Sequence, residues 1–437
     1  MSVRSGGVAP RNANLAATPA RAIPPPVSEL IPAAELPAFQ TQLLGWFAEA
    51  KRDLDWRRTR DAYRVWISEI MLQQTRVAAV LPYYQRFLAR FPTLDALARA
   101  RLDAVLRSWA GLGYYSRARN LQRAAKEIVA RHAGEFPRRI EEALALPGIG
   151  HYTAAAVLSI AYGEPHAVLD GNVVRVLARL GAIRGDLRRP KRWRELAAAA
   201  NALLPAQAAS AAGPLSSPGD WNQAMMELGA TLCTPRGPQC AVCPVSRWCR
   251  AHALGIALRL PAPRPKPKPV RLALSAAVLL DPRGRTLLLR QKGQHSSLFS
   301  SLWHFPAIQS ARPAPEKLSR YLQSAFGITG ALEPLPPARH TVTFRRILLA
   351  PFLVRVAKLP AVTSPTHGFP PPTLHAPASR ARALQAPRAP RSGDVRTPPL
   401  AKIERLPISS ATKKIAAAAL AALNALPRRR QRASLSF

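Results

Sequence analysis

The sequence predicts a mainly helical N-terminal domain over residues 36–257, followed by an α+β domain over residues 271–426. Apolar residues in the first region recur at three- and four-residue spacing, which is typical of amphipathic helices. Proline then occupies every second position of residues 261–269, so we expect a semi-rigid extended linker over residues 258–270. After this linker, short apolar runs separated by turn residues indicate strands mixed with helices.

Local patterns predict individual elements within each region. In the helical region the spacing is clear in Leu43, Leu44 and Phe47, and again in Trp66, Ile67 and Ile70. In the second region we expect strands at residues 272–280, 286–290 and 347–356, and helices at residues 316–326 and 411–426. We expect disorder in the N-terminal tail 1–35, in the Pro/Ala/Arg-rich insertion 358–400 and in the basic tail 427–437.

The chain carries a formal net charge of +39, from 63 basic and 24 acidic residues. Such an excess favours a polyanionic partner, and nucleic acid is the leading class. No run of 18 apolar residues occurs, so we expect no membrane span. We expect a monomer located with DNA, in the cytoplasm and nucleoid of a bacterium or in an organelle or the nucleus of a eukaryote.

All four cysteines lie within 17 residues, and they are Cys233, Cys240, Cys243 and Cys249. Their gathering in one loop predicts a single metal site. Four thiolates in a compact loop suit the corners of a 4Fe–4S cluster. Zinc is the alternative, although zinc ribbons usually pair two Cys-x2-Cys knuckles and only one such knuckle is present. A disulfide is disfavoured because nothing else marks the chain as secreted.

A glycine-containing turn at residues 146–150 (LPGIG) separates two helical patterns. Gly148 and Gly150 permit a tight turn whose backbone N–H groups approach a phosphate closely. This is the form of a helix-hairpin-helix DNA-binding element. The turn alone is weak evidence, but the basic, cysteine-bearing segment that follows strengthens it.

The hairpin and the cysteine loop together resemble the endonuclease III superfamily of base-excision DNA glycosylases, in particular its adenine glycosylase (MutY-type) branch. The resemblance covers roughly residues 39–249 and, more loosely, the C-terminal domain. The matching segments are residues 53–57 (DLDWR), 65–75 (VWISEIMLQQT), 111–115 (GLGYY), 169–173 (LDGNV) and 221–229 (WNQAMMELG). One position departs from the family pattern, because Asp55 stands where the family usually has proline.

Two carboxylates carry the reaction that the resemblance implies. Cleaving an N-glycosidic bond requires a proton for the leaving base and stabilisation of an oxocarbenium-like sugar. Glu69 lies in an apolar helical pattern, where burial would raise its pKa as a general acid needs. The resemblance implies that Glu69 protonates adenine at N7 and then helps activate the nucleophile, while ionised Asp170 stabilises or transiently attacks the sugar cation. The structural alternatives are an exposed helical glutamate and an N-cap aspartate.

One position bears on strand cleavage. Bifunctional members of the superfamily carry a lysine two residues after the second hairpin glycine, and this lysine forms a Schiff base that nicks DNA. Tyr152 occupies that position here. The resemblance therefore implies base hydrolysis without efficient strand cleavage, with Tyr152 and Asn172 orienting Asp170 and the sugar. Helix packing is the alternative role for Tyr152.

Base removal requires extraction of the target nucleotide from the stack. By resemblance, Gln74 and Tyr114 wedge into the duplex, and Thr75 and Leu112 lie near the opposing base. The adenine pocket is expected to contain Arg52, Leu54, Trp56 and Gln223, although a tryptophan here is also typical of a core. Further DNA contacts are expected from Arg57, Leu72, Gln73 and the two hairpin glycines, Gly148 and Gly150.

The C-terminal domain resembles a Nudix hydrolase, and the resemblance implies that it recognises 8-oxoguanine opposite the adenine. A working Nudix enzyme needs an acidic helix to hold magnesium. Residues 306–326 contain Glu316 as their single acid, so we expect binding without nucleotide hydrolysis. In the lesion-reading loop, Thr343 keeps a hydroxyl, whereas its neighbours Val342 and Phe344 differ from the family pattern or are ordinary strand residues.

These expectations combine into a monofunctional adenine DNA glycosylase with one 4Fe–4S cluster. Its partner would be double-stranded DNA that contains adenine mispaired with 8-oxoguanine or guanine. A bifunctional glycosylase/lyase is disfavoured by Tyr152, and a non-catalytic iron–sulfur DNA-binding protein by Glu69 and Asp170. A Nudix-type nucleotide hydrolase is disfavoured because the acidic helix is missing.

Overall fold

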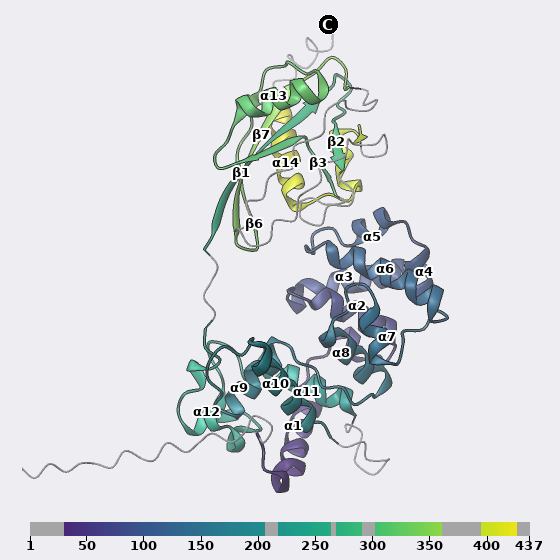
Figure 1. Ribbon diagram of the computed structural model, residues 1–437. Coiled ribbons are helices and arrows are strands. Elements are labelled where there is room, and N and C mark those ends of the chain that lie inside the picture. Colours follow the sequence, from purple (N-terminus) through teal and green to yellow (C-terminus); the bar gives the residue numbers. More distant parts are fainter. Residues whose placement is uncertain (1–29, 206–216, 264–267, 291–301, 361–394, 426–437) are drawn as a thin grey trace, which may run out of the picture. The chain divides into compact units, whose positions relative to one another are not determined.

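The computed structural model describes residues 30–205, 217–263, 268–290, 302–360 and 395–425. The chain divides into two compact units, each built from separate stretches of sequence. Figure 1 labels the helices and strands of both units. The smaller unit contains residues up to Lys51 together with residues 169–216 and 223–262. The larger unit contains residues 52–168, 217–222 and those from 263 onward.

The helical part of the larger unit is arranged around one buried helix. Its helices are α2 (Ala62–Leu72), α3 (Val77–Arg90), α4 (Leu94–Arg99), α5 (Leu102–Ser108), α6 (Ser116–Arg131), α7 (Ile140–Ala145) and α8 (His151–Tyr162). Asp61 begins α2 by accepting a hydrogen bond from the backbone N–H of Arg64. Trp66 and Ile67 of α2 are fully buried, so this helix lies at the centre of the core.

The smaller unit brings together helices from both ends of the helical sequence. They are α1 (Leu36–Ala50), α9 (Gly171–Leu180), α10 (Pro190–Ala202), most of α11 (Pro218–Thr231) and α12 (Arg250–Ala253). Phe39 of α1 packs edge-on against Trp248, with 5.3 Å between ring centroids. The indole N–H of Trp248 donates to Glu35 at 2.6 Å, so the start of the chain is fastened to the cysteine-bearing segment.

The C-terminal part is built on a mixed sheet. Its longest strands, β1 (Val270–Leu280) and β7 (Arg345–Arg355), pair in parallel over their whole length. Strands β4 (Ala307–Ser310), β5 (Glu333–Pro334) and β6 (Ala338–Val342) add antiparallel edges. A smaller sheet joins β2 (Leu288–Arg290), β3 (Trp303–His304) and β8 (Val395–Arg396).

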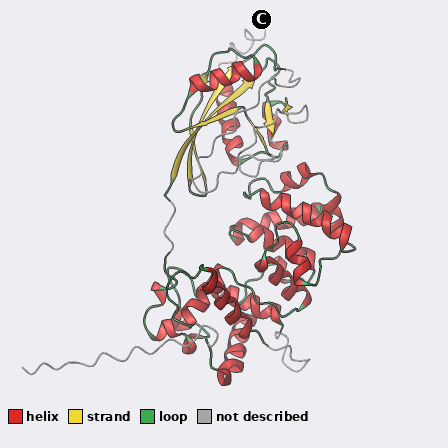
Figure 2. Ribbon diagram, in the orientation of Figure 1, coloured by secondary structure: helices red, strands yellow, loops and turns green. Residues whose placement is uncertain are grey.

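Helices cover both faces of the larger sheet, as the strand alternation requires. Ala276 and Val278 of β1 face one core, which also contains Ile415 of α14 (Ser410–Ala425). Ala277 faces the other core with Leu318 of α13 (Pro315–Phe326). Figure 2 shows this sheet in yellow with its helices in red. The expectation of a mainly helical region followed by an α+β region is confirmed.

The compact units and the ordered segments are bounded differently from the expected domains. The helical sequence 36–257 does not form one compact unit, because residues 52–168 separate from the stretches on either side. Residues 30–35 of the expected disordered tail are ordered, and Leu30 and Ile31 are buried there. This segment is ordered because it completes the apolar core of the smaller unit.

The expected linker and insertion also begin or end differently. Leu260 is buried, and its carbonyl accepts a hydrogen bond from Arg179, so the linker starts as packed structure. Residues 395–400 form β8 and the start of η7 (Leu400–Arg405), because the edge of β2 offers them a partner. Residues 1–29, 361–394 and 427–437 of the expected disordered segments lie outside the described residues. Within the described part of the chain, no helix has the length and apolar character needed to cross a membrane.

Candidate functional site

Glu69 lies inside the helical core of the larger unit. It sits on α2 between buried residues and is itself only 5% exposed. The hydroxyl of Tyr152, in the first turn of α8, donates a hydrogen bond to Glu69 Oε2 at 2.6 Å. The alternative of an exposed helical glutamate is therefore wrong. A buried carboxyl with a fixed hydroxyl donor is a group that can hold or release a proton in a defined direction.

Replacing Tyr152 with phenylalanine is expected to slow the base excision that the family resemblance implies by about ten- to hundredfold, the equivalent of roughly 1.4–2.7 kcal/mol. The hydroxyl restrains the Glu69 carboxyl, so its loss should affect the chemical step more than DNA binding. The measurement is single-turnover excision beside a binding titration. Tyr162→Phe is the matched control, because Tyr162 at the other end of α8 donates to the Phe136 carbonyl at 2.8 Å. Equal rates for the two variants would remove Tyr152 from the site.

Asp170 forms the N-cap of α9 in the smaller unit. Its Oδ1 accepts hydrogen bonds from the backbone N–H groups of Asn172 at 2.9 Å and Val173 at 2.8 Å. The side-chain amide of Asn172 donates to the other oxygen at 2.9 Å. Burial raises the pKa of Asp170 from its ordinary value, and these hydrogen bonds and the charge of Arg175 oppose that shift. The cap hydrogen bonds orient the carboxylate and favour its ionised form, whereas burial makes its ionisation costly.

Arg175 is a residue of this region that the sequence patterns did not single out. Its guanidinium donates to Asn172 Oδ1 at 2.8 Å and to the carbonyl oxygens of Cys233 and Gly229, both at 2.7 Å. It therefore joins the residues around Asp170 to the first cysteine of the cysteine loop. An arginine among the apolar residues of the helix 171–180 was the available signal.

Two turns carry the residues expected to enter the duplex. Gln74 follows α2 with φ of 56°, and Tyr114 precedes α6 with φ of 47°. A side chain in this left-handed region costs about 1–2 kcal/mol, so both turns are strained. Both side chains are exposed, Tyr114 by 42%. Backbone strain that presents an exposed aromatic residue is a feature of a site rather than of a core.

The two turns line the same pocket of about 250 Å³. Its lining residues are Trp66, Ile70, Gln73, Gln74, Tyr114, Ser116, Arg117, Asn120, Leu121, Pro147 and Gly148. Gln73 also donates to the Thr153 hydroxyl at 3.2 Å, which ties this wall to α8. Leu72, the last residue of α2, and Thr75 flank the Gln73–Gln74 pair, whereas Leu112 is buried.

The hairpin reaches this pocket through Gly148. Its φ is 79°, and a Cβ there would lie 2.7 Å from Cβ of Asn120, so only glycine fits. Gly150 differs, because it caps α8 with φ of −107° and an added Cβ would meet nothing within 4 Å. Glycine at position 150 instead leaves the N-terminal N–H groups of α8 accessible, as anion binding requires.

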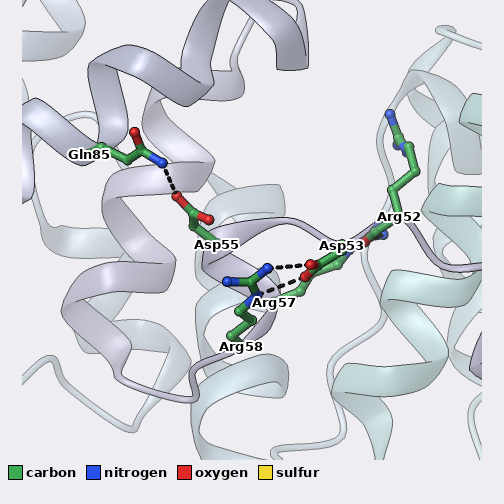
Figure 3. A network of polar contacts seen from close by, with 6 residues as sticks. All are labelled: Arg52, Asp53, Asp55, Arg57, Arg58 and Gln85. Carbon is green, nitrogen blue, oxygen red and sulfur yellow. Dashed lines mark hydrogen bonds and ion pairs between the residues drawn. The ribbon is translucent and has the colours of Figure 1, made fainter.

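The segment from Arg52 to Arg57 forms a turn with its own polar network (Figure 3). Arg57 donates to the Arg52 carbonyl at 3.2 Å, and Gln85 donates to Asp55 at 2.8 Å. The aspartate that replaces the family's usual proline thus fastens this turn to α3. In Figure 3 the side chain of Arg52 points away from these contacts.

Two residues expected in an adenine pocket are buried in this structure. Leu54 and Trp56 are only 6% and 7% exposed, and Trp56 packs edge-on against Tyr84 at 5.3 Å. Trp56 therefore has the surroundings of a core tryptophan in this structure. Gln223 lies on α11 in the other compact unit from Arg52, Leu54 and Trp56.

The expected lesion-reading loop is the tight hairpin turn between β6 and β7. Thr343 is the first of the two turn residues and has φ of 55°. Its hydroxyl donates to the Val342 carbonyl at 2.7 Å. Phe344 is 39% exposed and lies under the guanidinium of Arg345, at 4.7 Å from its ring centroid. Val342 ends β6, while Thr343 and Phe344 lie in the turn, so Phe344 is not an ordinary strand residue.

The four cysteines are partly buried free thiols in the smaller unit. Burial, with a smaller contribution from the charges of the other three cysteines, raises the pKa of Cys243 to about 11. Arg179 donates to the sulfur of Cys233 at 3.2 Å and to the Thr234 carbonyl at 2.9 Å. Among the described residues, no three His, Cys, Asp or Glu side chains are arranged to hold a metal ion.

Comparison with known proteins relates part of the chain to one family of DNA repair proteins. Residues 67–201 match the family model of the HhH-GPD superfamily base excision DNA repair proteins. This segment contains Glu69, the hairpin, Asp170 and Asn172. Over this segment the chain is similar to that superfamily.

The chain is also similar to adenine DNA glycosylases. The human enzyme is 48% identical over 229 residues, which cover 50% of this chain and 40% of the human protein. The Arabidopsis thaliana enzyme is 38% identical over 344 residues, covering 69% of this chain and 53% of the relative. The chain thus spans about half the length of these relatives. A solved structure of a thermostable thymine-DNA glycosylase is 28% identical, covers 51% of this chain and 98% of its own, and has a TM-score of 0.45.

Proposed function

We propose that this protein is an adenine DNA glycosylase that hydrolyses the N-glycosidic bond of adenine mispaired with 8-oxoguanine or guanine. The observation that carries the proposal is the buried Glu69 carboxyl with the Tyr152 hydroxyl 2.6 Å away. This tyrosine stands where a lyase would need its amine nucleophile, so the reaction ends at base removal. The similarity to adenine DNA glycosylases supports adenine as the base.

The proposed chemistry assigns one role to each carboxyl. Protonated Glu69 gives its proton to N7 of adenine, so the base leaves neutral as its bond to the sugar breaks. The ionised Asp170 stabilises the positive charge left on the sugar, and Asn172 holds that carboxylate in place. Water then adds to the anomeric carbon and its proton passes to Glu69. The products are free adenine and an abasic site.

The proposed DNA contacts include the two exposed turns that contain Gln74 and Tyr114. Gln74 and Tyr114 enter the base stack, and Thr75 and Leu112 lie beside the opposing base. Backbone N–H groups after Gly148 and Gly150 bind a phosphate of the same duplex. Other contacts proposed from the family pattern involve Arg52, Leu54, Trp56, Arg57, Leu72, Gln73 and Gln223, and Thr343 of the C-terminal domain reads the 8-oxoguanine.

We also propose that Cys233, Cys240, Cys243 and Cys249 hold one 4Fe–4S cluster. Four thiols in one partly buried loop have the donor chemistry that such a cluster requires. The cluster would supply a structural crosslink of the loop. Arg179 is suited to support it, because a buried guanidinium beside a thiolate stabilises the deprotonated ligand. The substrate is double-stranded DNA, on which the protein would act as a monomer.

The proposal is tested by single-turnover reaction with a duplex that carries one adenine opposite 8-oxoguanine, analysed with and without alkali. Strand breaks that appear only after alkali are the expected result, because alkali cleaves the abasic product. Matched duplexes with adenine opposite guanine and opposite thymine measure mispair selectivity. A break without alkali would contradict the monofunctional assignment, and tight binding without any product would contradict catalysis.

A further inference from the structure

Arg117 is buried between the two strained turns of the pocket. It lies in the first turn of α6 and is only 8% exposed. One of its terminal nitrogens, Nη1, donates to the carbonyl oxygens of Ile70 and Met71 at 2.9 Å and of Gln73 at 2.5 Å. These carbonyls belong to the end of α2, where the helix itself supplies no donors.

The other terminal nitrogen faces both turns. Nη2 of Arg117 donates to the Thr75 hydroxyl at 3.1 Å and to the Gly113 carbonyl at 3.3 Å. The guanidinium carbon also lies 5.3 Å from the ring centroid of Tyr114. The hydrogen bonds of Arg117 to Gln73 and Thr75 therefore lie on either side of Gln74. Its contacts with Gly113 and Tyr114 hold the turn that contains Tyr114.

One guanidinium thus contacts the neighbours of two left-handed residues that come from distant parts of the sequence. Gln74 and Tyr114 are separated by the whole of α3, α4 and α5, yet both line the pocket that Arg117 also lines. Strained turns relax when their backbone partners are removed. The planar guanidinium of Arg117 donates to both turns, so it fixes the distance between them as well as the conformation of each.

We propose that Arg117 is a positioning residue that couples Gln74 and Tyr114, so that the two side chains enter DNA as one rigid unit. This inference rests on the proposed function, because it assumes that both side chains contact the duplex. Arg117 itself touches no reacting atom. Its effect is to remove the independent motion of the two turns before DNA binds.

Lysine cannot replace this arginine in the proposed role. The lysine ammonium carries the same charge but has one nitrogen instead of two terminal nitrogens in a plane. It therefore cannot donate to the carbonyls at the end of α2 and to the Gly113 carbonyl in the same geometry. Arg117→Lys thus keeps a cation in the pocket while it breaks the link between the turns. Arg123→Lys is the matched control, because Arg123 is an exposed residue of the same helix.

The test is a double-mutant cycle of Gln74→Ala and Tyr114→Ala, made once with Arg117 and once in the Arg117→Lys background. Duplex distortion is read from the fluorescence of 2-aminopurine placed opposite 8-oxoguanine, and excision is read from single turnovers of the adenine duplex. With Arg117 present, the double variant is expected to lose about as much duplex distortion and excision rate as either single variant. Its activity would then be about tenfold higher than the product of the two single losses predicts. In the Arg117→Lys background, the two losses are expected to multiply.

A structural role alone predicts a different outcome. It would lower the melting temperature of Arg117→Lys and leave the coupling between Gln74 and Tyr114 unchanged, and that result would overturn the proposal. Absence of coupling with Arg117 present would also overturn it. If Arg117→Lys does not fold, Thr75→Val replaces it, because this change removes one acceptor of the guanidinium without leaving the arginine unpaired. The fluorescence signal does not depend on excision. If the unaltered protein excises no adenine, the proposed function fails, and the fluorescence cycle still tests the coupling separately.

Discussion

Replacing Glu69 with glutamine should lower single-turnover adenine excision by about 10²–10⁴-fold, the contribution typical of a general acid. The substitution removes the acidic proton but almost no volume. The Tyr152 hydroxyl can still donate to the amide oxygen, so the helical core should remain intact. DNA binding is expected to change by less than about threefold, and stability only slightly. Rates from rapid-quench single turnovers and affinities from a mismatch-binding titration measure the two effects separately.

Glu49→Gln is the matched control for this experiment. Glu49 is an exposed glutamate of α1, so the same chemical change should leave excision unchanged there. If Glu69→Gln retained the original excision rate, another group would have to protonate the leaving base. Equal loss of binding and rate would instead point to a folding defect.

Replacing Cys240 with serine should remove the brown chromophore and reduce iron from about four atoms per chain toward zero. Serine is nearly isosteric, but its hydroxyl is a poor ligand for iron. Without the crosslink, the loop should open and both DNA binding and thermal stability should fall. Iron analysis, absorbance and a thermal melt of the purified protein test this without reference to catalysis.

Val242→Ser is the control, because Val242 is a 64% exposed residue between two of the cysteines. It introduces serine in the same loop and should leave the iron content unchanged. Unchanged iron in Cys240→Ser would contradict the cluster. Zinc in place of iron in the unaltered protein would support the alternative metal site.

The sequence pattern predicted the helical surroundings of Glu69 and the glycine-containing turn of the hairpin. Positions 74, 114 and 343 were singled out by the family resemblance, which does not describe their backbone angles. All three of these turn residues have left-handed backbone conformations, which are rare for residues other than glycine. Nothing in a single sequence shows that Gln, Tyr or Thr will adopt such angles, because surrounding tertiary contacts impose them.

The supporting arginines could not be predicted in the same way. Arg117 and Arg175 lie among many basic residues of a strongly cationic chain, where a surface position is the ordinary expectation. Their importance depends on carbonyl oxygens that come together only when turns distant in the sequence fold against each other. For the same reason, periodicity alone predicted one helical domain where the chain forms two compact units.

The contact between the first helix and the cysteine-bearing segment has a consequence for the order of folding during synthesis. Glu35 and its partner Trp248 are 213 residues apart, and Phe39 packs on the same indole. At about 5–20 residues per second, the ribosome needs roughly ten to forty seconds to make the intervening chain. During that interval Phe39 lacks its native contact with Trp248, so the packing of α1 on the cysteine-bearing segment is completed only after residues 36–248 have been made.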